Sequence, residues 1–168
     1  VLGVSCQEFK REGAFAEYVA VPQHILYPLP EKVSFEQAAM VEPVAVALHA
    51  VNLTQVSLND TAVVGGAGMI ALFVIQLLKL AGCRQIIAFD LDPDRLALAR
   101  KLGATHTFKA GEIHISEEVK KLTNGRGADI GFEVVGVTPV LKTVIESVRK
   151  GAQVTLIGNV AAEVELPL

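Results

Sequence analysis

The chain has 168 residues, a formal net charge of −3 and 51% hydrophobic residues, so it can bury one substantial core, and its mixed charges offer no basic surface for a nucleic-acid partner. Its longest apolar run, residues 69–80, is too short to span a bilayer and contains Gln76 and Lys79, so we expect no membrane partner. The only two cysteines, Cys6 and Cys83, match no disulfide or metal spacing, which is typical of a protein of the reducing cytoplasm.

Residues 1–32 differ in pattern from the rest of the chain. Alternation of small or apolar residues with polar ones over Gly13–Pro22 predicts a strand, and Pro28 and Pro30 end the short segment that follows. A stretch of this size cannot bury a core alone, so we expect it to pack against other sequence. Because Val1 is not an initiator methionine, we expect the chain to be a piece of a longer protein.

Two helical segments are predicted next. Ser34–Gln37 is a capping box, which opens a helix that runs through Met40. Pro43 then either kinks this helix or begins a new one that reaches about Val51. Glu42 precedes the proline in a run of apolar residues, where a carboxylate needs a partner.

A glycine-rich turn lies in the middle of Thr61–Asp90. This stretch reads as a β-branched strand, a turn that fits G-x-G-x-x-G/A, a long apolar helix and a second strand. Gly66 permits the tight turn, Gly68 lets the backbone approach a pyrophosphate, and Ala71 keeps the helix close to the sheet. Asp90 ends the second strand, where a carboxylate accepts hydrogen bonds from a ribose and repels a 2′-phosphate. The sequence therefore predicts binding of NAD rather than NADP.

Strands and helices alternate from residue 61 onward. The further elements are a helix over 93–102 ended by Gly103, a strand over 105–108, a helix over 113–124 capped by Ser116, a strand over 129–135, a helix from 138 ended by Gly151, and a strand over 153–158. This alternation predicts a doubly wound α/β fold of the Rossmann type, with a parallel sheet of order 3-2-1-4-5. The fold usually has six strands, so we expect truncation before the sixth.

The predicted cofactor crevice lies at the carboxyl ends of the strands. We assign cofactor binding to Gly66, Gly68, Met69, Ile70, Asp90, Arg95, Val135, Gly136, Ile157 and Gly158. Arg95 either flanks the adenine ribose or is a solvated helix residue. Val46 lies one helical turn after Glu42 and can reach a nicotinamide, whereas His49 on the same face is more simply structural. Glu133 is expected to bond to nearby backbone.

These motifs resemble the medium-chain dehydrogenase/reductase family, in its zinc-dependent polyol branch of sorbitol, galactitol-1-phosphate, threonine and butanediol dehydrogenases. The matching pieces are GAFAEYVAVP, MVEPVAVALHAV, GGAGMIAL, DLDPDRLALARKLGA and GFEVVG, in that order along nearly the whole chain. The resemblance implies that residues 1–32 are a remnant of a GroES-like catalytic domain and that residues 33–168 form the NAD-binding domain.

The resemblance also implies a chemistry. The whole protein would oxidise an alcohol or polyol reversibly, with zinc polarising the hydroxyl and the nicotinamide taking a hydride. Glu42 matches the family glutamate at the catalytic zinc, bound directly or through water; from the residues alone, without this match, a solvent-facing or helix-capping glutamate is the simpler interpretation. The other ligands would precede this chain, so we expect no turnover and weak NAD binding from it alone. Relatives of this kind are dimers or tetramers.

Two other interpretations remain open. The chain can be a non-catalytic nucleotide-binding or sensing module, because a fold does not define a function. It can also belong to a zinc-free, quinone-oxidoreductase-like reductase, although such a site has no need of Glu42. A cysteine and a Gly-His-Glu segment in the preceding sequence would favour the zinc enzyme.

Overall fold

The computed structural model describes residues 12–166 of the chain, which divides into two compact units, Val1–Ala38 and Ala39–Leu168. The predicted boundary after residue 32 lies inside the first unit, and the assignment of residues 1–32 to another domain remains a prediction. Cys6 lies outside the described residues. Within residues 12–166, no helix combines the length and the apolar character needed to cross a membrane.

The first unit contains a short 3-10 helix, η1 (Gln23–Ile25), and most of α1 (Phe35–Ala39). The predicted capping box is confirmed at the start of α1. The N–H of Gln37 donates to Ser34 Oγ at 3.2 Å, and the N–H of Ser34 donates to Gln37 Oε1 at 3.0 Å. Each side chain thus satisfies a backbone donor that the helix leaves unpaired.

The strand predicted over Gly13–Pro22 is wrong. Residues 12–22 contain no strand, and Phe15 and Tyr18 are almost fully exposed. A strand forms only where a neighbouring strand accepts and donates its backbone hydrogen bonds. The alternating pattern of this segment was sufficient to suggest a strand, but none of the described residues pairs with it.

The second unit alternates helices and strands. Its strands are β1 (Thr61–Gly65), β2 (Gln85–Asp90), β3 (His106–Lys109), β4 (Ala128–Glu133) and β5 (Val148–Leu156). Its helices are α2 (Val41–Leu53), α3 (Met69–Leu80), α4 (Pro93–Leu102), α5 (Ile115–Leu122) and α6 (Thr138–Ser147). All paired strands are parallel, in the order β3-β2-β1-β4-β5. The predicted doubly wound α/β fold and its strand order are therefore confirmed.

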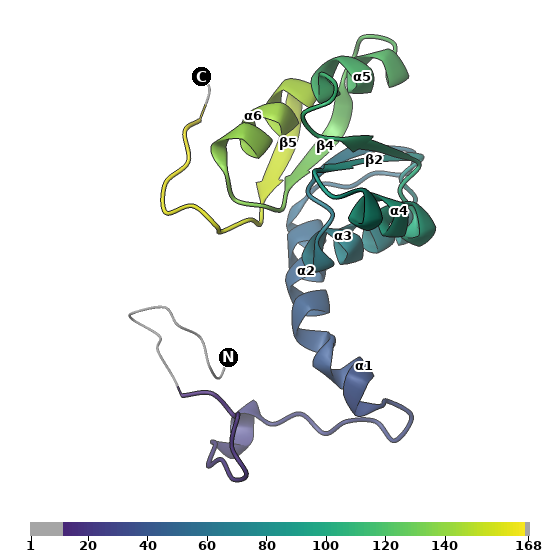
Figure 1. Ribbon diagram of the computed structural model, residues 1–168. Coiled ribbons are helices and arrows are strands. Elements are labelled where there is room, and N and C mark those ends of the chain that lie inside the picture. The colour runs from purple at the N-terminus through teal and green to yellow at the C-terminus, as the bar shows by residue number, and fades with distance from the viewer. Residues whose placement is uncertain (1–11, 167–168) are drawn as a thin grey trace. The chain divides into compact units, whose positions relative to one another are not determined.

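Helices cover both faces of this sheet, with α3 and α4 on one side and α5 and α6 on the other (Figure 1). Side chains on β1 alternate between the two layers. Ala62 and Val64 belong to the cluster that packs against α2, α3 and α4, whereas Val63 belongs to the cluster of α5 and α6. All three are fully buried, so β1 is apolar on both faces, as a central parallel strand must be.

Helix α2 is a separate helix, because Met40 interrupts the helical run between α1 and α2. Pro43 lies in its first turn, where a missing N–H costs no hydrogen bond. At the other end, Thr54 Oγ1 lies 2.6 Å from Thr155 Oγ1, and Gln153 Nε2 donates to the carbonyl of Leu53 at 2.9 Å. The carboxyl end of α2 is thereby fastened to β5.

Several predicted boundaries need correction, among them that of the strand expected over 153–158, which is β5 at Val148–Leu156. His114, not Ser116, is the N-cap of α5, so Ser116 lies in the first turn. Helix α6 ends at Ser147, and Gly151 lies inside β5, where its φ of +73° accommodates an irregular stretch of backbone. Strand β4 ends at Glu133 because the next residues turn back to bond its carboxylate.

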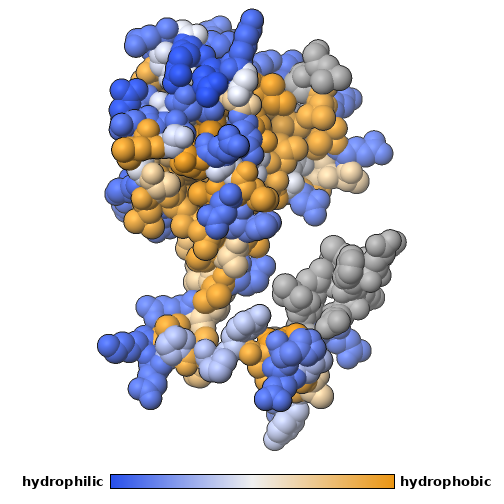
Figure 2. Space-filling model, turned by 180° about the vertical axis from the view of Figure 1, so that it is seen from behind, coloured by the Kyte–Doolittle hydropathy of each residue, from blue (hydrophilic) through white to orange (hydrophobic). Residues whose placement is uncertain are grey.

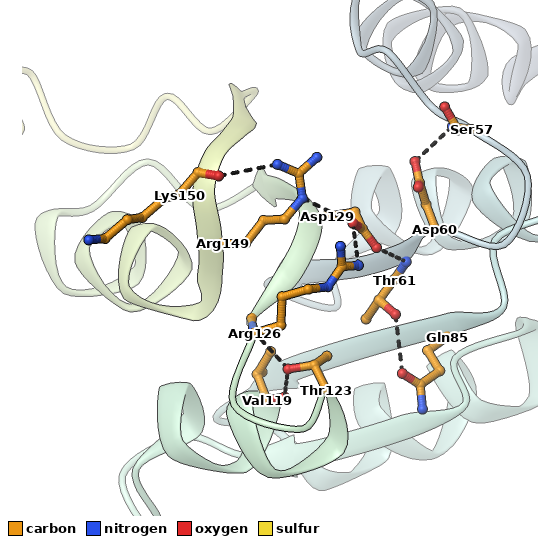
Figure 3. Close-up of polar contacts among 11 residues, drawn as sticks. Ser57, Asp60, Thr61, Gln85, Val119, Thr123, Arg126, Asp129, Arg149 and Lys150 are labelled. Carbon is orange, nitrogen blue, oxygen red and sulfur yellow. Dashed lines mark hydrogen bonds and ion pairs between the residues drawn. The ribbon is translucent and has the colours of Figure 1, made fainter.

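A charged cluster joins three segments at the amino edge of the sheet (Figure 3). Asp129 Oδ1 accepts from Arg126 Nη2 at 2.6 Å and from Arg149 Nε at 3.1 Å, and its Oδ2 accepts from the N–H of Thr61 at 3.0 Å. Burial alone would raise the pKa of Asp129. The Thr61 N–H and the two guanidinium groups outweigh burial and lower this pKa below its usual value.

This lowered pKa predicts a loss of stability in acid. A carboxyl group whose pKa is depressed by folding stabilises the fold above its unfolded pKa, about 3.9, and this contribution disappears as the pH falls through the folded value. We expect the free energy of unfolding, measured in urea, to fall less steeply below about pH 4 in Asp129→Asn than in the wild type. The exposed Asp94→Asn control should keep the wild-type slope. Identical pH profiles for all three proteins would contradict the assignment.

Candidate functional site

The glycine turn connects β1 to α3 at the carboxyl edge of the sheet. Gly66 has a φ of +104°, and a Cβ at this position would lie 2.8 Å from Val135 Cγ2. Its N–H donates to the carbonyl of Phe89 at 2.8 Å, which holds the turn against the end of β2. Only glycine fits both the backbone conformation and the space.

Gly68 is the N-cap of α3 and has an ordinary φ of −73°. A Cβ built at this position would meet nothing within 4 Å, so the backbone borders open space. The first N–H groups of a helix have no partner within it, and they attract anions such as phosphate. The exposed Met69 begins this helix, whereas Ile70 packs partly against the core.

Asp90 makes two hydrogen bonds at the end of β2. Its Oδ2 accepts from the N–H of Ala67 at 2.6 Å, and its Oδ1 accepts from the N–H of Asp92 at 2.9 Å. A carboxylate has about four acceptor positions, so this arrangement leaves capacity for two ribose hydroxyls. The predicted ribose contact remains a prediction.

Arg95 lies beside the glycine turn. Together with Gly68 and Met69 it lines a pocket of about 380 Å³, whose other walls are mostly apolar side chains of α3 and α4. Its Nε lies 3.6 Å from Asp92 Oδ2, and both side chains are about half exposed. Such a pair is weak, so Arg95 is free to engage a ligand.

Glu133 connects the loops that follow β4 and β5. Its side chain is buried, and Oε1 accepts from the N–H of Val135 at 2.9 Å and of Gly136 at 2.8 Å. The predicted bond of Glu133 to nearby backbone is therefore confirmed. Its carbonyl accepts from the N–H of Ile157 at 2.8 Å and of Gly158 at 3.1 Å. One residue thus ties together four residues at the ends of β4 and β5 that we assigned to cofactor binding.

Gly136, in the loop after β4, and Gly158, in the loop after β5, face each other. A Cβ on Gly158 would collide with the backbone of Gly136 and Val135, and a Cβ on Gly136 would collide with the backbone around residues 158–160. The two loops therefore approach at backbone distance.

A second pocket, of about 430 Å³, borders the end of β2 and was missed by the sequence analysis. Residues that line it include Leu91, Ala110, Ile113, Val137 and Pro139. Val135, Gly136, Ile157 and Gly158, which we assigned to cofactor binding, are not among its lining residues. The sequence feature that could have indicated this pocket is the apolar Leu91, which directly follows Asp90 at the end of the strand.

Glu42 is exposed in the first turn of α2, and Val46 and His49 on the same helix are also exposed. The exposed apolar side chains of this helix are Val41, Val46, Leu48 and Leu53. Figure 2 shows orange, hydrophobic surface over much of one face of the second unit. Residues 12–166 contain no group of three or more His, Cys, Asp or Glu side chains that could hold a metal. The exposed carboxylate of Glu42 has the chemistry of an oxygen ligand. The described residues do not form a zinc site by themselves.

Comparison with known proteins relates this chain to dehydrogenases. A family model described as zinc-binding dehydrogenase matches residues 70–168. Sorbitol dehydrogenase of Bacillus subtilis (strain 168) is 35% identical over 157 residues, which cover 94% of this chain and 44% of that protein. The chain thus spans less than half the length of this relative.

Two solved structures share the fold. An alcohol dehydrogenase from Thermus sp. ATN1 superposes with a TM-score of 0.86 at 31% identity, covering 95% of this chain and 48% of that one. A putative zinc-binding dehydrogenase from Sinorhizobium meliloti 1021, bound to NADP, has a TM-score of 0.81 at 29% identity and covers 94% and 47%.

Proposed function

The chain belongs to the zinc-binding dehydrogenase family, and on this premise we propose that it is the NAD-binding portion of an alcohol or polyol dehydrogenase. The observation that carries the proposal is the glycine turn. Gly66 needs its positive φ, and Gly68 leaves open space above the first turn of α3. This geometry suits a pyrophosphate that binds at a helix N-terminus.

The proposed cofactor is NAD rather than NADP. Asp90 ends β2 beside the turn, and the Asp92 residue two positions on, whose N–H donates to Asp90 Oδ1, carries a second negative charge near the same point. Two negative charges at this point would repel a 2′-phosphate. The relative from S. meliloti is bound to NADP, so the choice requires a direct measurement.

The whole protein is proposed to transfer a hydride between a secondary alcohol and the nicotinamide. Zinc, when bound, would lower the pKa of the alcohol. This chain's own residues would bind and orient the cofactor, with the turn at the pyrophosphate and the loops after β4 and β5 as the wall. Glu42 would provide one carboxylate oxygen to the zinc, directly or through water, and the exposed Val46 would lie near the nicotinamide.

Titration with the two nucleotides tests the proposal. We expect the 168-residue chain to bind NAD weakly, NADP at least about tenfold more weakly, and to show no turnover by itself. Isothermal calorimetry gives both affinities. A preference for NADP would overturn the cofactor assignment, and no binding of either nucleotide to the chain or to the whole protein would overturn the dehydrogenase assignment.

The role of Glu42 is tested in the whole protein. We expect Glu42→Gln to lower zinc content, measured by atomic absorption, or to shift the pH profile of alcohol oxidation if a water intervenes. The exposed Glu36→Gln on α1 is the matched control. Unchanged zinc content together with an unchanged pH profile would remove Glu42 from the metal site.

We also propose that the whole protein is a cytoplasmic dimer or tetramer. Among the described strands, β5 pairs with β4 alone, and an open sheet edge readily pairs with a second copy. Sedimentation of the whole protein would give its assembly state.

A further inference from the structure

We infer that Asp90 has a second role, resting on the proposed function: it fastens the glycine turn in its binding conformation before any nucleotide arrives. To bind a ribose, the Asp90 carboxylate needs only to face the ligand. In the structure the same carboxylate also accepts the N–H of Ala67 in the glycine turn and the N–H of Asp92, two residues along the chain. Asp90 is therefore a positioning residue for the turn that would bind the pyrophosphate.

The bond to Ala67 is the important one. Its length of 2.6 Å is short for an N–H donor, in line with the shortening that a charged acceptor causes. Ala67 is fully buried between Gly66 and Gly68, so its N–H has no access to water. Without the carboxylate this donor would be left unpaired, and the turn would have to move to satisfy it.

The second bond anchors the carboxylate itself. Asp92 N–H holds Oδ1, while Asp92 Oδ1 caps α4 by accepting from the N–H groups of Asp94 and Arg95. The glycine turn is thus connected through Asp90 to the first turn of α4. In the nucleotide-free protein, the glycine turn would therefore stay fixed relative to the first turn of α4.

This arrangement has a consequence for ligands that lack ribose hydroxyls. If Asp90 acted through the ribose alone, its replacement would leave their affinity unchanged. If it also fastens the turn, the replacement weakens every ligand that uses the pyrophosphate site, because the turn must be ordered when the ligand binds.

The test compares ADP with 2′,3′-dideoxyADP in the wild type, Asp90→Asn and Asp94→Asn. Asparagine keeps the size of Asp90 but offers an acceptor oxygen at only one end, so it can accept from only one of the two N–H groups. Asp94 is an exposed carboxylate in the adjacent helical turn, and its replacement removes the same charge. We expect Asp90→Asn to weaken both ligands by about tenfold, and Asp94→Asn to change neither appreciably.

Hydrogen exchange of the Ala67 amide in the nucleotide-free protein supplies a readout that does not depend on binding. We expect it to accelerate by about tenfold or more in Asp90→Asn and to stay unchanged in Asp94→Asn. Unchanged exchange, or a loss of affinity confined to ADP, would overturn the positioning role. If neither nucleotide binds the wild type, the proposed function fails, while the exchange measurement still decides whether Asp90 fastens the turn.

Discussion

Replacement of Gly68 by alanine should abolish most nucleotide binding while leaving the fold intact. The φ of −73° at this position suits any residue, and the added methyl group would meet no atom of the protein within 4 Å. The only new contact would be with a ligand that approaches the backbone closely. We expect NAD affinity to fall by at least about tenfold. The free energy of unfolding should change by about 1 kcal/mol or less, since Gly68 is an N-cap without a side-chain hydrogen bond.

Gly125→Ala is the matched control for this variant. Gly125 lies in the turn after α5, at the other edge of the sheet, and a Cβ there also meets nothing within 4 Å. Its φ of +84° disfavours alanine, so this variant should lose about 1 kcal/mol of stability without any change in NAD affinity. Calorimetric titration and urea unfolding of both variants give the comparison. Wild-type affinity in Gly68→Ala would show that no ligand approaches this backbone.

The overall fold could be predicted because it depends on local patterns. The glycine turn, the apolar strands and the cap at Asp92 are each encoded within a few residues, and their alternation leaves one common strand order. The segment Gly13–Pro22 has an equally local pattern, but a strand also needs a partner. The prediction failed there because pairing is not a local property.

In the candidate site, the conformation of the glycine turn and the backbone contact of Glu133 could be predicted, whereas the contacts of Asp90 could not. Nothing in the sequence places Asp90 beside the N–H of Ala67, since this contact arises only when β1 and β2 end at the same edge. The pocket near Leu91 and Pro139 likewise combines loops from distant parts of the chain. Motif glycines can be recognised because each one meets a need of its own backbone conformation. The residues that line a pocket depend instead on which loops the sheet brings together.

Glu133 is the residue whose loss should destabilise the crevice most. Its Oε1 accepts from the N–H groups of Val135 and Gly136, and its side chain is only 2% exposed. Alanine would leave both donors without their acceptor and would open a cavity. Because each unsatisfied buried donor costs about 1–3 kcal/mol, we expect Glu133→Ala to lose about 2–5 kcal/mol of unfolding free energy and most of its NAD affinity.

Glutamine at position 133 separates hydrogen bonding from charge. Its amide oxygen can accept from both N–H groups, so Glu133→Gln should retain most of the stability, with a loss of about 1 kcal/mol. Glu146→Gln on the exposed face of α6 removes the same charge from a weak ion pair with Lys142 and should change stability by less than about 0.5 kcal/mol. Urea unfolding of the three variants, with NAD titration of those that fold, gives the measurement. If Glu133→Ala were as stable as the wild type, the loops after β4 and β5 would be held by their backbone contacts alone, and the carboxylate would have no part in building the wall.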